Sequence, residues 1–362
     1  VRIGPEGWRV VGGKDVPVRF IRRKGMESLP VPIVGGSIDE LRGLVNLPED
    51  GQWKLAMGWL IAAFRPKGPY AVLAVSGEHG SAKSTLCKLF RRLLDPNKAD
   101  IRRPPKTERE VVIAAHNGWI SAYNNLSGLT PELSDALCSL TTDGGFSART
   151  LCTDEDETIF DARRPVMLNG IEEIVNRPDL LDRTFLLALT TIPEEHRRTE
   201  EWIFAEFEKV RPRVLGALLD GVSAAFRFKD SVKVPNLPRM ADLAIWITAA
   251  EAGLGWEPNS FMEAYRRNRS GANAMAIESA LIGPPLAQFI DAVGVFTGSA
   301  TDLLDKLDKA RGDKAAPFGW PTSGKAMTMA LKRLAPNLRA SGSEVYLPNE
   351  RTGKDRVRVI RV

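Results

Sequence analysis

Residues Ala71 to Leu94 read AVLAVSGEHGSAKSTLCKLFRRLL, and the fold class follows from this stretch. Its first five residues form a short apolar run that is typical of a buried parallel strand. Further along, apolar side chains recur at helical spacing from Leu86 to Leu94, and Asp95-Pro96 predicts the end of that helix. A strand, a glycine-rich turn, Lys-Ser-Thr and a helix in this order predict a phosphate-binding P-loop.

The turn has the composition of an anion-binding loop. Gly77 and Gly80 allow the backbone to curl so that its N–H groups point at phosphate oxygens, and the helix that begins near Lys83 adds the positive end of its dipole. We expect the Lys83 ammonium to reach the β- and γ-phosphates of ATP and the Ser84 hydroxyl to hold Mg²⁺. The predicted ATP-binding residues are Gly77, Glu78, His79, Gly80, Ser81, Ala82, Lys83, Ser84 and Thr85.

One residue of the loop departs from the usual pattern. Ala82 stands where such loops carry a glycine before the lysine. Because alanine tolerates a helical φ, the replacement is expected to cost little at the first helical turn. An ordinary glycine-rich turn between a strand and a helix is the alternative interpretation of the whole stretch.

Composition indicates a globular protein of two or three domains, with 362 residues, 43% hydrophobic and 26% charged. No apolar run reaches the ~18 residues that a membrane span needs, so no membrane partner is expected. The three cysteines, Cys87, Cys138 and Cys152, and the three histidines are scattered without metal-ligand spacing. We therefore expect a reduced cytoplasmic protein without zinc or disulfides. Its start at Val1 suggests a fragment of a longer protein.

The basic excess lies at the C-terminal end. The net charge is +5, and residues 301–362 hold 13 Lys and Arg against 7 Asp and Glu. Three helices are expected at residues 277–292, 300–310 and 323–338, followed by a basic hairpin of residues 345–347 and 357–362. This layout predicts a winged-helix domain that binds DNA, with a solvated basic tail as the alternative. The predicted DNA contacts in this segment are Lys325, Lys332, Arg333, Lys354, Arg356 and Arg358.

The rest of the chain predicts an α/β core. Short strands at 71–75, 111–115, 119–123, 165–169 and 184–189 alternate with helical segments, which indicates a parallel sheet with nucleotide at the strand ends. Strand-like runs at 8–11 and 18–21 predict a β-rich collar or connector. The predicted parts are residues 1–50 for the collar, 51–235 for the P-loop ATPase core, 236–275 for a helical lid or linker, and 276–362 for the winged-helix domain.

Polar motifs follow the P-loop in a definite order. Asn124-Asn125 ends the strand at 119–123, where an ATPase needs an acid to orient Mg²⁺. A turn containing Gly144-Gly145 and Arg149 comes next, then Asn169 at the end of a buried strand, and Arg183 fourteen residues later.

This succession resembles the superfamily 3 helicases, a branch of the AAA+ ATPases, and most of all those of mobile elements and phages that often follow a primase-polymerase domain. The resemblance covers about residues 50 to 230 and implies an AAA+ parallel sheet with helices on both faces. It implies that Asn169 is sensor 1, that Arg183 is an arginine finger supplied to a neighbour's ATP, and that Gly144-Gly145 with Arg149 forms a pore hairpin on single-stranded DNA. A strand cap for Asn169 and a surface arginine for Arg183 are the structural alternatives.

The departure from the family pattern is at Asn124, whose position is usually an acid. Asparagine keeps the shape but loses the charge that anchors hydrated Mg²⁺, so Asn124 would hold the ion only through water. Three explanations for this asparagine remain open. The protein is a natural weak ATPase, it is an engineered trap for the ATP-bound state, or another segment such as residues 154–157 supplies the acid.

The resemblance predicts a hexameric ring that uses ATP and Mg²⁺ as a helicase on single-stranded or forked DNA during replication, with Lys83, Asn124, Asn125, Asn169 and Arg183 as its catalytic residues. A nucleotide-gated DNA loader or switch with little hydrolysis is the main alternative, and Asn124 favours it. A small-molecule kinase is the third hypothesis, in which the basic tail would have no purpose.

Overall fold

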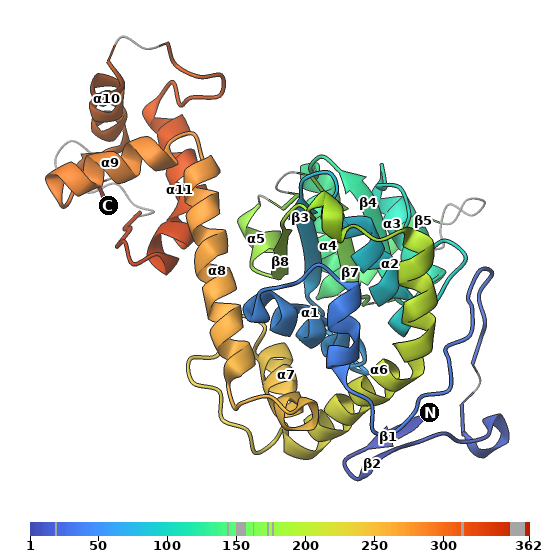
Figure 1. Ribbon diagram of the computed structural model, residues 1–362. Helices are drawn as coiled ribbons and strands as arrows, with labels where there is room; N and C mark the ends of the chain where they lie inside the picture. Colours follow the sequence, from blue (N-terminus) through green and yellow to red (C-terminus); the bar gives the residue numbers. More distant parts are fainter. Residues whose placement is uncertain are drawn as a thin grey trace. The chain divides into compact units, whose positions relative to one another are not determined.

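The computed structural model describes residues 1–18, 20–142, 145–149, 157–161, 163–171, 174–175, 177–312, 315–347 and 359–362, with only the backbone course for 145–149, 157–161 and 359–361. The chain consists of two compact units, Val1–Arg266 and Arg267–Val362 (Figure 1). Helix α8 (Ser260–Ser279) contains the boundary between them. The finer division into four parts stays a prediction.

A four-stranded parallel sheet forms the centre of the first unit. Its strands are ordered β4-β7-β3-β8, and all neighbours are parallel. The bounds are Val72–Gly77 for β3, Ser121–Leu126 for β4, Val166–Gly170 for β7 and Thr184–Leu189 for β8. The predicted α/β class with a parallel sheet is therefore confirmed, and the P-loop strand β3 is central.

The prediction of a fifth strand at residues 111–115 is wrong. These residues belong to helix α3 (Glu108–His116), which begins where the Thr107 side chain accepts a hydrogen bond from the Glu110 N–H. Val111, Ala114 and Ala115 are buried, and their spacing of three and four residues is that of one helix face. An N-cap and a helical apolar face thus outweighed the β-branched composition of this run.

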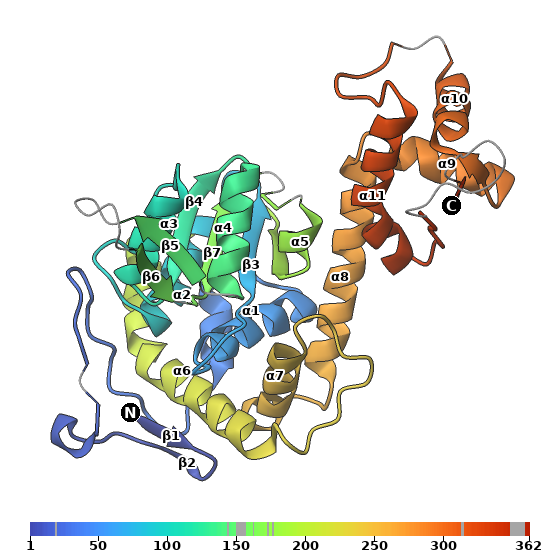
Figure 2. The same ribbon diagram turned by 180° about the vertical axis from the view of Figure 1, so that it is seen from behind.

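Helices cover both faces of the sheet. Strand residues alternate, so that Leu73 and Val75 join one buried cluster with α1, α2, α6 and α7, whereas Val72 and Ala74 are buried outside this cluster. Figure 1 shows α1 on one side, and Figure 2, seen from behind, shows α4 on the other. The helix bounds are Asp50–Ala63 for α1, Lys83–Leu94 for α2, Pro131–Thr141 for α4, Pro178–Leu181 for α5, Glu200–Phe228 for α6 and Ala241–Leu254 for α7.

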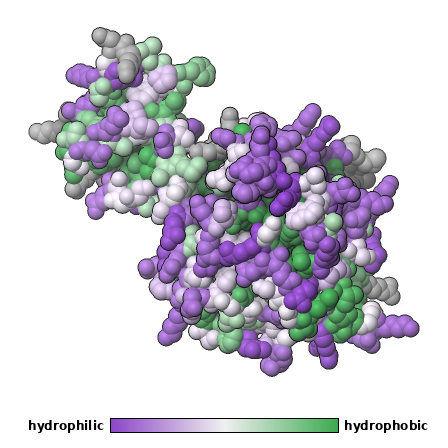
Figure 3. All heavy atoms as spheres, in the orientation of Figure 1, coloured by the Kyte–Doolittle hydropathy of each residue, from purple (hydrophilic) through white to green (hydrophobic). Residues whose placement is uncertain are grey.

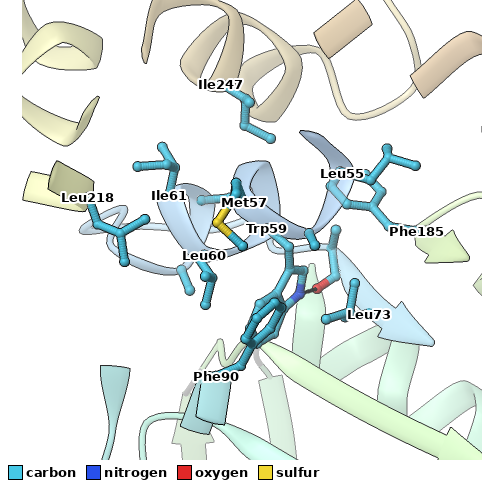
Figure 4. Packing of buried hydrophobic residues seen from close by; sticks show 14 of the residues in the cluster. Leu55, Met57, Trp59, Leu60, Ile61, Leu73, Phe90, Phe185, Leu218 and Ile247 are labelled. Atoms are coloured by element: carbon cyan, nitrogen blue, oxygen red, sulfur yellow. Dashed lines mark hydrogen bonds between the residues drawn. The ribbon is translucent and has the colours of Figure 1, made fainter. Parts of the chain in front are cut away.

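Helix α1 lies in the centre of the main cluster and is apolar on nearly all sides, as expected of a buried helix (Figure 4). The Trp59 indole N–H donates to the carbonyl oxygen of Ala71 at 2.8 Å, so the one polar atom of this ring is satisfied just before β3. This contact fixes the start of the P-loop strand against α1.

The N-terminal segment has less strand than predicted. Strands β1 (Arg2–Gly4) and β2 (Gly7–Arg9) form a small antiparallel pair, followed by 3-10 helices at Gly13–Asp15 and Ile38–Leu44. The predicted strand at 18–21 is absent from its described residues, and the side chains of Phe20 and Ile21 are exposed there. The first unit is largely hydrophilic on the face shown in Figure 3, with one gathering of hydrophobic side chains at its lower edge.

A two-stranded antiparallel pair follows α4, at the place of the predicted pore hairpin. Strand β5 (Gly145–Arg149) pairs with β6 (Glu157–Asp161), with Gly145 opposite Asp161 and Arg149 opposite Glu157. Gly144, the Arg149 side chain and most of the acidic residues 154–157 lie outside what the structure describes.

The second unit has its own core and consists of α9 (Gly283–Val293), β9 (Thr297–Ser299), α10 (Ala300–Arg311), α11 (Gly324–Ala340) and β10 (Val359–Arg361). The three predicted helices are present, although the first begins at Gly283 because residues 277–279 belong to α8. Strand β9, which the sequence pattern did not reveal, pairs antiparallel with β10. Lys354, Arg356 and Arg358 lie outside the described residues.

No helix in the described parts of the chain combines the length and the apolar character that crossing a membrane requires.

Candidate functional site

The P-loop joins β3 to α2 and curls around a lysine. Gly77 has a φ of 149°, and a Cβ there would lie 2.4 Å from the carbonyl oxygen of Leu189, so only glycine fits. Gly80 has a φ of 80°. The Lys83 ammonium donates to the carbonyl oxygens of Gly77 and Glu78, each at 2.6 Å. Partial burial lowers the pKa of Lys83. The positive charge therefore lies inside the curve of the loop, at the first residue of α2.

The expectation for Ala82 was wrong. This residue does not adopt a helical φ but has φ 61° and ψ 26°, in the left-handed region. An L-residue is less stable there than in a right-handed conformation by about 1–2 kcal/mol, a penalty that glycine escapes. The loop thus keeps the backbone that the usual glycine would adopt, and Ala82 holds it under strain.

Ser84 links the P-loop helix to the strand that carries the two asparagines. Its hydroxyl donates to the Asn124 side-chain oxygen at 3.2 Å. Asn124 and Asn125 lie within β4 rather than beyond its end, and the register of β4 on β7 shifts between Tyr123 and Leu126. Asn125 has a φ of 57° in this irregular stretch. This irregularity accompanies the approach of Asn124 to Ser84.

Asn169 completes the same cluster. It is buried on β7, paired in register with Val75 of β3, and its side-chain oxygen accepts the backbone N–H of Asn125 at 3.2 Å. Its amide nitrogen donates to the Cys87 sulfur at 3.7 Å. Burial raises the pKa of the Cys87 thiol to about 12, so this thiol is neutral. The structure therefore brings Lys83, Ser84 and all three predicted asparagines together at the carboxyl edge of the sheet.

The chemistry of these groups bears on Mg²⁺ binding. Ser84 and Asn124 offer two neutral oxygens, and the part of the chain that the structure describes holds no group of three or more His, Cys, Asp or Glu side chains suited to a metal. Mg²⁺ prefers oxygen ligands and is often held by one or two carboxylates together with substrate phosphates. The residues present fit an ion whose charge is balanced mainly by phosphate.

Asn46, which no sequence pattern pointed to, also stabilises the P-loop. The Asn46 amide nitrogen donates to the carbonyl oxygen of Ser81 at 3.1 Å and to that of Thr190 at 2.6 Å. The Ile192 N–H donates to the carbonyl oxygen of Gly80 at 3.2 Å. The chain beyond β8 therefore runs along the loop, and Asn46 ties the two together.

Arg183 lies apart from this cluster. It directly precedes β8, at the opposite end of the strand from the P-loop edge, and is only 8% exposed. Its guanidinium forms an ion pair with Asp179 at 2.7 Å. Burial alone would raise the pKa of Asp179, but the bonds and charges of Arg183 and Arg239 lower it. Arg183 is thus held within its own unit, and its role as an arginine finger stays a prediction.

The predicted DNA contacts on α11 lie on its outer face. Lys325, Lys332 and Arg333 are exposed, whereas Met327 and Leu331 are buried in the core of the second unit. Helix α11 therefore has three exposed cationic side chains, and their contact with DNA stays a prediction.

Two family models match this chain. The model of the actinomycete integrative conjugative element replication protein matches residues 38–270, and the model of the C-terminal domain of the same RepA proteins matches residues 282–362. The chain belongs to this replication protein family. The expected relationship to proteins of mobile elements is thereby confirmed, and the first match contains the whole P-loop cluster.

Solved structures show distant similarity. The C-terminal region of NrS-1 is 13% identical with a TM-score of 0.43, and the match covers 91% of this chain and 76% of that one. The JCV helicase is 11% identical with a TM-score of 0.31, over 60% of this chain and 64% of that one. A search of curated proteins found no match.

Proposed function

We propose that this replication protein is an ATP-dependent, helicase-like motor that acts on single-stranded or forked DNA during replication of an integrative element. One observation carries the proposal, namely the Lys83 ammonium inside the curve of the P-loop, with Ser84 joined to Asn124 beside it. A curled loop, a helix N-terminus and a lysine together form a site for the phosphates of a nucleotide.

Each residue of the cluster has a distinct task in this proposal. Lys83 would bind the β- and γ-phosphates, and Ser84, together with Asn124 through water, would hold Mg²⁺, which would neutralise phosphate charge when bound. Asn169 would bond the attacking water or the terminal phosphate, and Asn125 and Cys87 hold its side chain in place. Arg183 would serve the ATP of a neighbouring subunit in a hexameric ring, once released from Asp179.

DNA would be held at two places. The antiparallel β5–β6 pair lies where the sequence predicts a pore hairpin, and Arg149 would grip the DNA backbone as ATP hydrolysis moves the hairpin. The second unit follows the order helix, strand, helix, helix, strand, with β9 paired to β10, which supports a winged helix. Lys325, Lys332 and Arg333 on α11 would then contact phosphates.

Asn124 favours a second candidate, a nucleotide-gated DNA switch with little hydrolysis. The oxygens that Ser84 and Asn124 offer are neutral, so this pair lacks the negative charge that orients Mg²⁺ during turnover. In this case ATP binding would change DNA affinity without unwinding.

The test compares wild type, Lys83→Ala and Asn124→Asp for ATP affinity, for hydrolysis with and without single-stranded DNA, and for unwinding of a fork. We expect Lys83→Ala to weaken ATP binding at least ~10-fold, about 1.4 kcal/mol, and Asn124→Asp to raise DNA-stimulated hydrolysis. Equal ATP binding by wild type and Lys83→Ala would refute the nucleotide site. ATP-dependent DNA affinity without turnover or unwinding, even in Asn124→Asp, would replace the motor by the switch.

A further inference from the structure

A second basic side chain lies beside the P-loop, and the proposed ATP site does not use it. Arg197 directly follows the short 3-10 helix Glu194–His196, beyond the end of β8. One terminal nitrogen of its guanidinium lies 3.6 Å from the position that a Cβ on Gly80 would take. The guanidinium therefore lies close to the loop at Gly80, which has no side chain of its own.

Arg197 is held there by the chain segment that follows the loop. Its Nε donates to the carbonyl oxygen of Ile192 at 3.1 Å, and the N–H of Ile192 itself donates to the carbonyl oxygen of Gly80 at 3.2 Å. The Thr191 hydroxyl donates to the Glu78 carboxylate at 3.2 Å. The segment and the loop are thus joined at several points, so that the position of Arg197 follows that of the P-loop.

The charge of Arg197 is only weakly balanced. Its ion pair is with Glu194 at 3.4 Å, and the two side chains are 48% and 87% exposed. An exposed pair of this kind is worth little and readily exchanges for a better anion. A guanidinium offers paired N–H donors that match phosphate oxygens, and such charge-assisted bonds are stronger than neutral ones.

We propose that Arg197 binds the phosphate chain of the nucleotide in the P-loop, in the same subunit as Lys83. The inference rests on the proposed function, since it requires a nucleotide in the P-loop. The two cations would then reach the phosphates from two different segments of the chain, Lys83 from the start of α2 and Arg197 from the segment beyond β8. Arg197 would supply part of the phosphate affinity in a site whose metal-side oxygens, from Ser84 and Asn124, are neutral.

The experiment measures the affinity of the full chain for ATP and for tripolyphosphate by titration calorimetry. The variants are Arg197→Gln and Arg197→Lys, and the matched control is Arg198→Gln. Arg198 is the next residue and lies over the Trp202 ring at 5.4 Å, so its replacement removes the same charge without touching the loop. Melting temperatures identify any variant that fails to fold, and Arg197→Lys keeps the charge if Arg197→Gln is unstable.

We expect Arg197→Gln to lower the affinity for ATP and for tripolyphosphate about 10-fold each, which corresponds to about 1.4 kcal/mol. The affinity of Arg197→Lys should lie between that of Arg197→Gln and that of wild type. The affinity of Arg198→Gln should stay within about twofold of wild type. Equal affinities for the two glutamine variants would overturn the proposal. A loss for ATP without a loss for tripolyphosphate would also overturn it, because Arg197 would then contact the nucleoside. Failure of the ATP site itself would appear separately, as wild-type binding that Lys83→Ala does not change.

Discussion

The left-handed backbone of Ala82 leads to a quantitative prediction for the variant Ala82→Gly. Ala82 has φ 61° and ψ 26° at the start of α2, and its side chain is only a methyl group. Replacing it with glycine removes one methyl group and leaves the backbone free to keep its present course. The loop should therefore be retained, and the steric strain at this residue should disappear.

The size of the effect is the difference between two terms. The left-handed conformation destabilises an L-residue by about 1–2 kcal/mol, and glycine does not share this penalty. Glycine also makes the unfolded chain more disordered, which lowers stability by about 0.4–1 kcal/mol. The difference lies between about 0 and 1.6 kcal/mol, so Ala82→Gly is expected to stabilise the first unit by about 0.8 kcal/mol. For a unit of this size, the melting temperature should rise by about 1–4 °C.

Two control variants, Gly255→Ala and Ala205→Gly, show whether the change in stability comes from the left-handed backbone. Gly255 follows α7 with φ 68° and ψ 26°, almost the backbone of Ala82, and a Cβ there would meet nothing within 4 Å. Gly255→Ala should therefore lower stability by a similar amount. Ala205 is exposed within α6, so Ala205→Gly should lower stability by about 1 kcal/mol. Thermal and urea denaturation of the full chain, followed by circular dichroism, measure all three variants.

The outcome that refutes the reasoning is a destabilised Ala82→Gly. If this variant melts below wild type, as Ala205→Gly is expected to do, Ala82 does not lie in the left-handed region. A rise for Ala82→Gly together with a fall for Gly255→Ala would support the strained loop.

Two further predictions concern buried carboxylates of the first unit. The Asp95 carboxylate accepts the backbone N–H groups of Trp119 and Ile120, just before β4, at 2.7 and 2.9 Å. It also forms an ion pair with the buried Arg91 at 3.0 Å. Asp95→Ala should therefore lower the free energy of unfolding by about 3–5 kcal/mol. Urea denaturation measures this loss. The control Lys209→Ala breaks an exposed ion pair with Glu206 and should change the free energy of unfolding by less than about 1 kcal/mol. Equal losses in the two variants would contradict the buried network around Asp95. For Glu251, burial raises the native pKa above the unfolded value of about 4.3. Its contribution to stability is therefore full below the unfolded pKa and is lost as pH rises through the native pKa. The stability of wild type relative to Glu251→Gln, measured by denaturation at pH 7 and pH 5, should rise at pH 5, and a fall would contradict the raised pKa.

Local sequence determined the central part of this protein. The P-loop, the parallel strands around it and the polar residues Asn124 and Asn169 on neighbouring strands were predictable, because each depends on a short pattern of apolar run, glycine and polar residue. Parallel strands place their carboxyl ends at one edge, so the meeting of Ser84 with Asn124 followed from strand order. The family relationship followed from the same motifs.

Two of the missed features depend on local sequence after all. Val111 to Ala115 has the composition of a strand, but the N-cap at Thr107 makes it a helix, and the ion pair of Arg183 is with Asp179, four residues before it. Only the tertiary structure decided the rest. Asn46 and Arg197 reach the P-loop from segments far along the chain, because packing of the sheet and its helices brings these segments together. The backbone of Ala82 was likewise set by the closure of the loop around Lys83, which outweighed the preference of alanine itself.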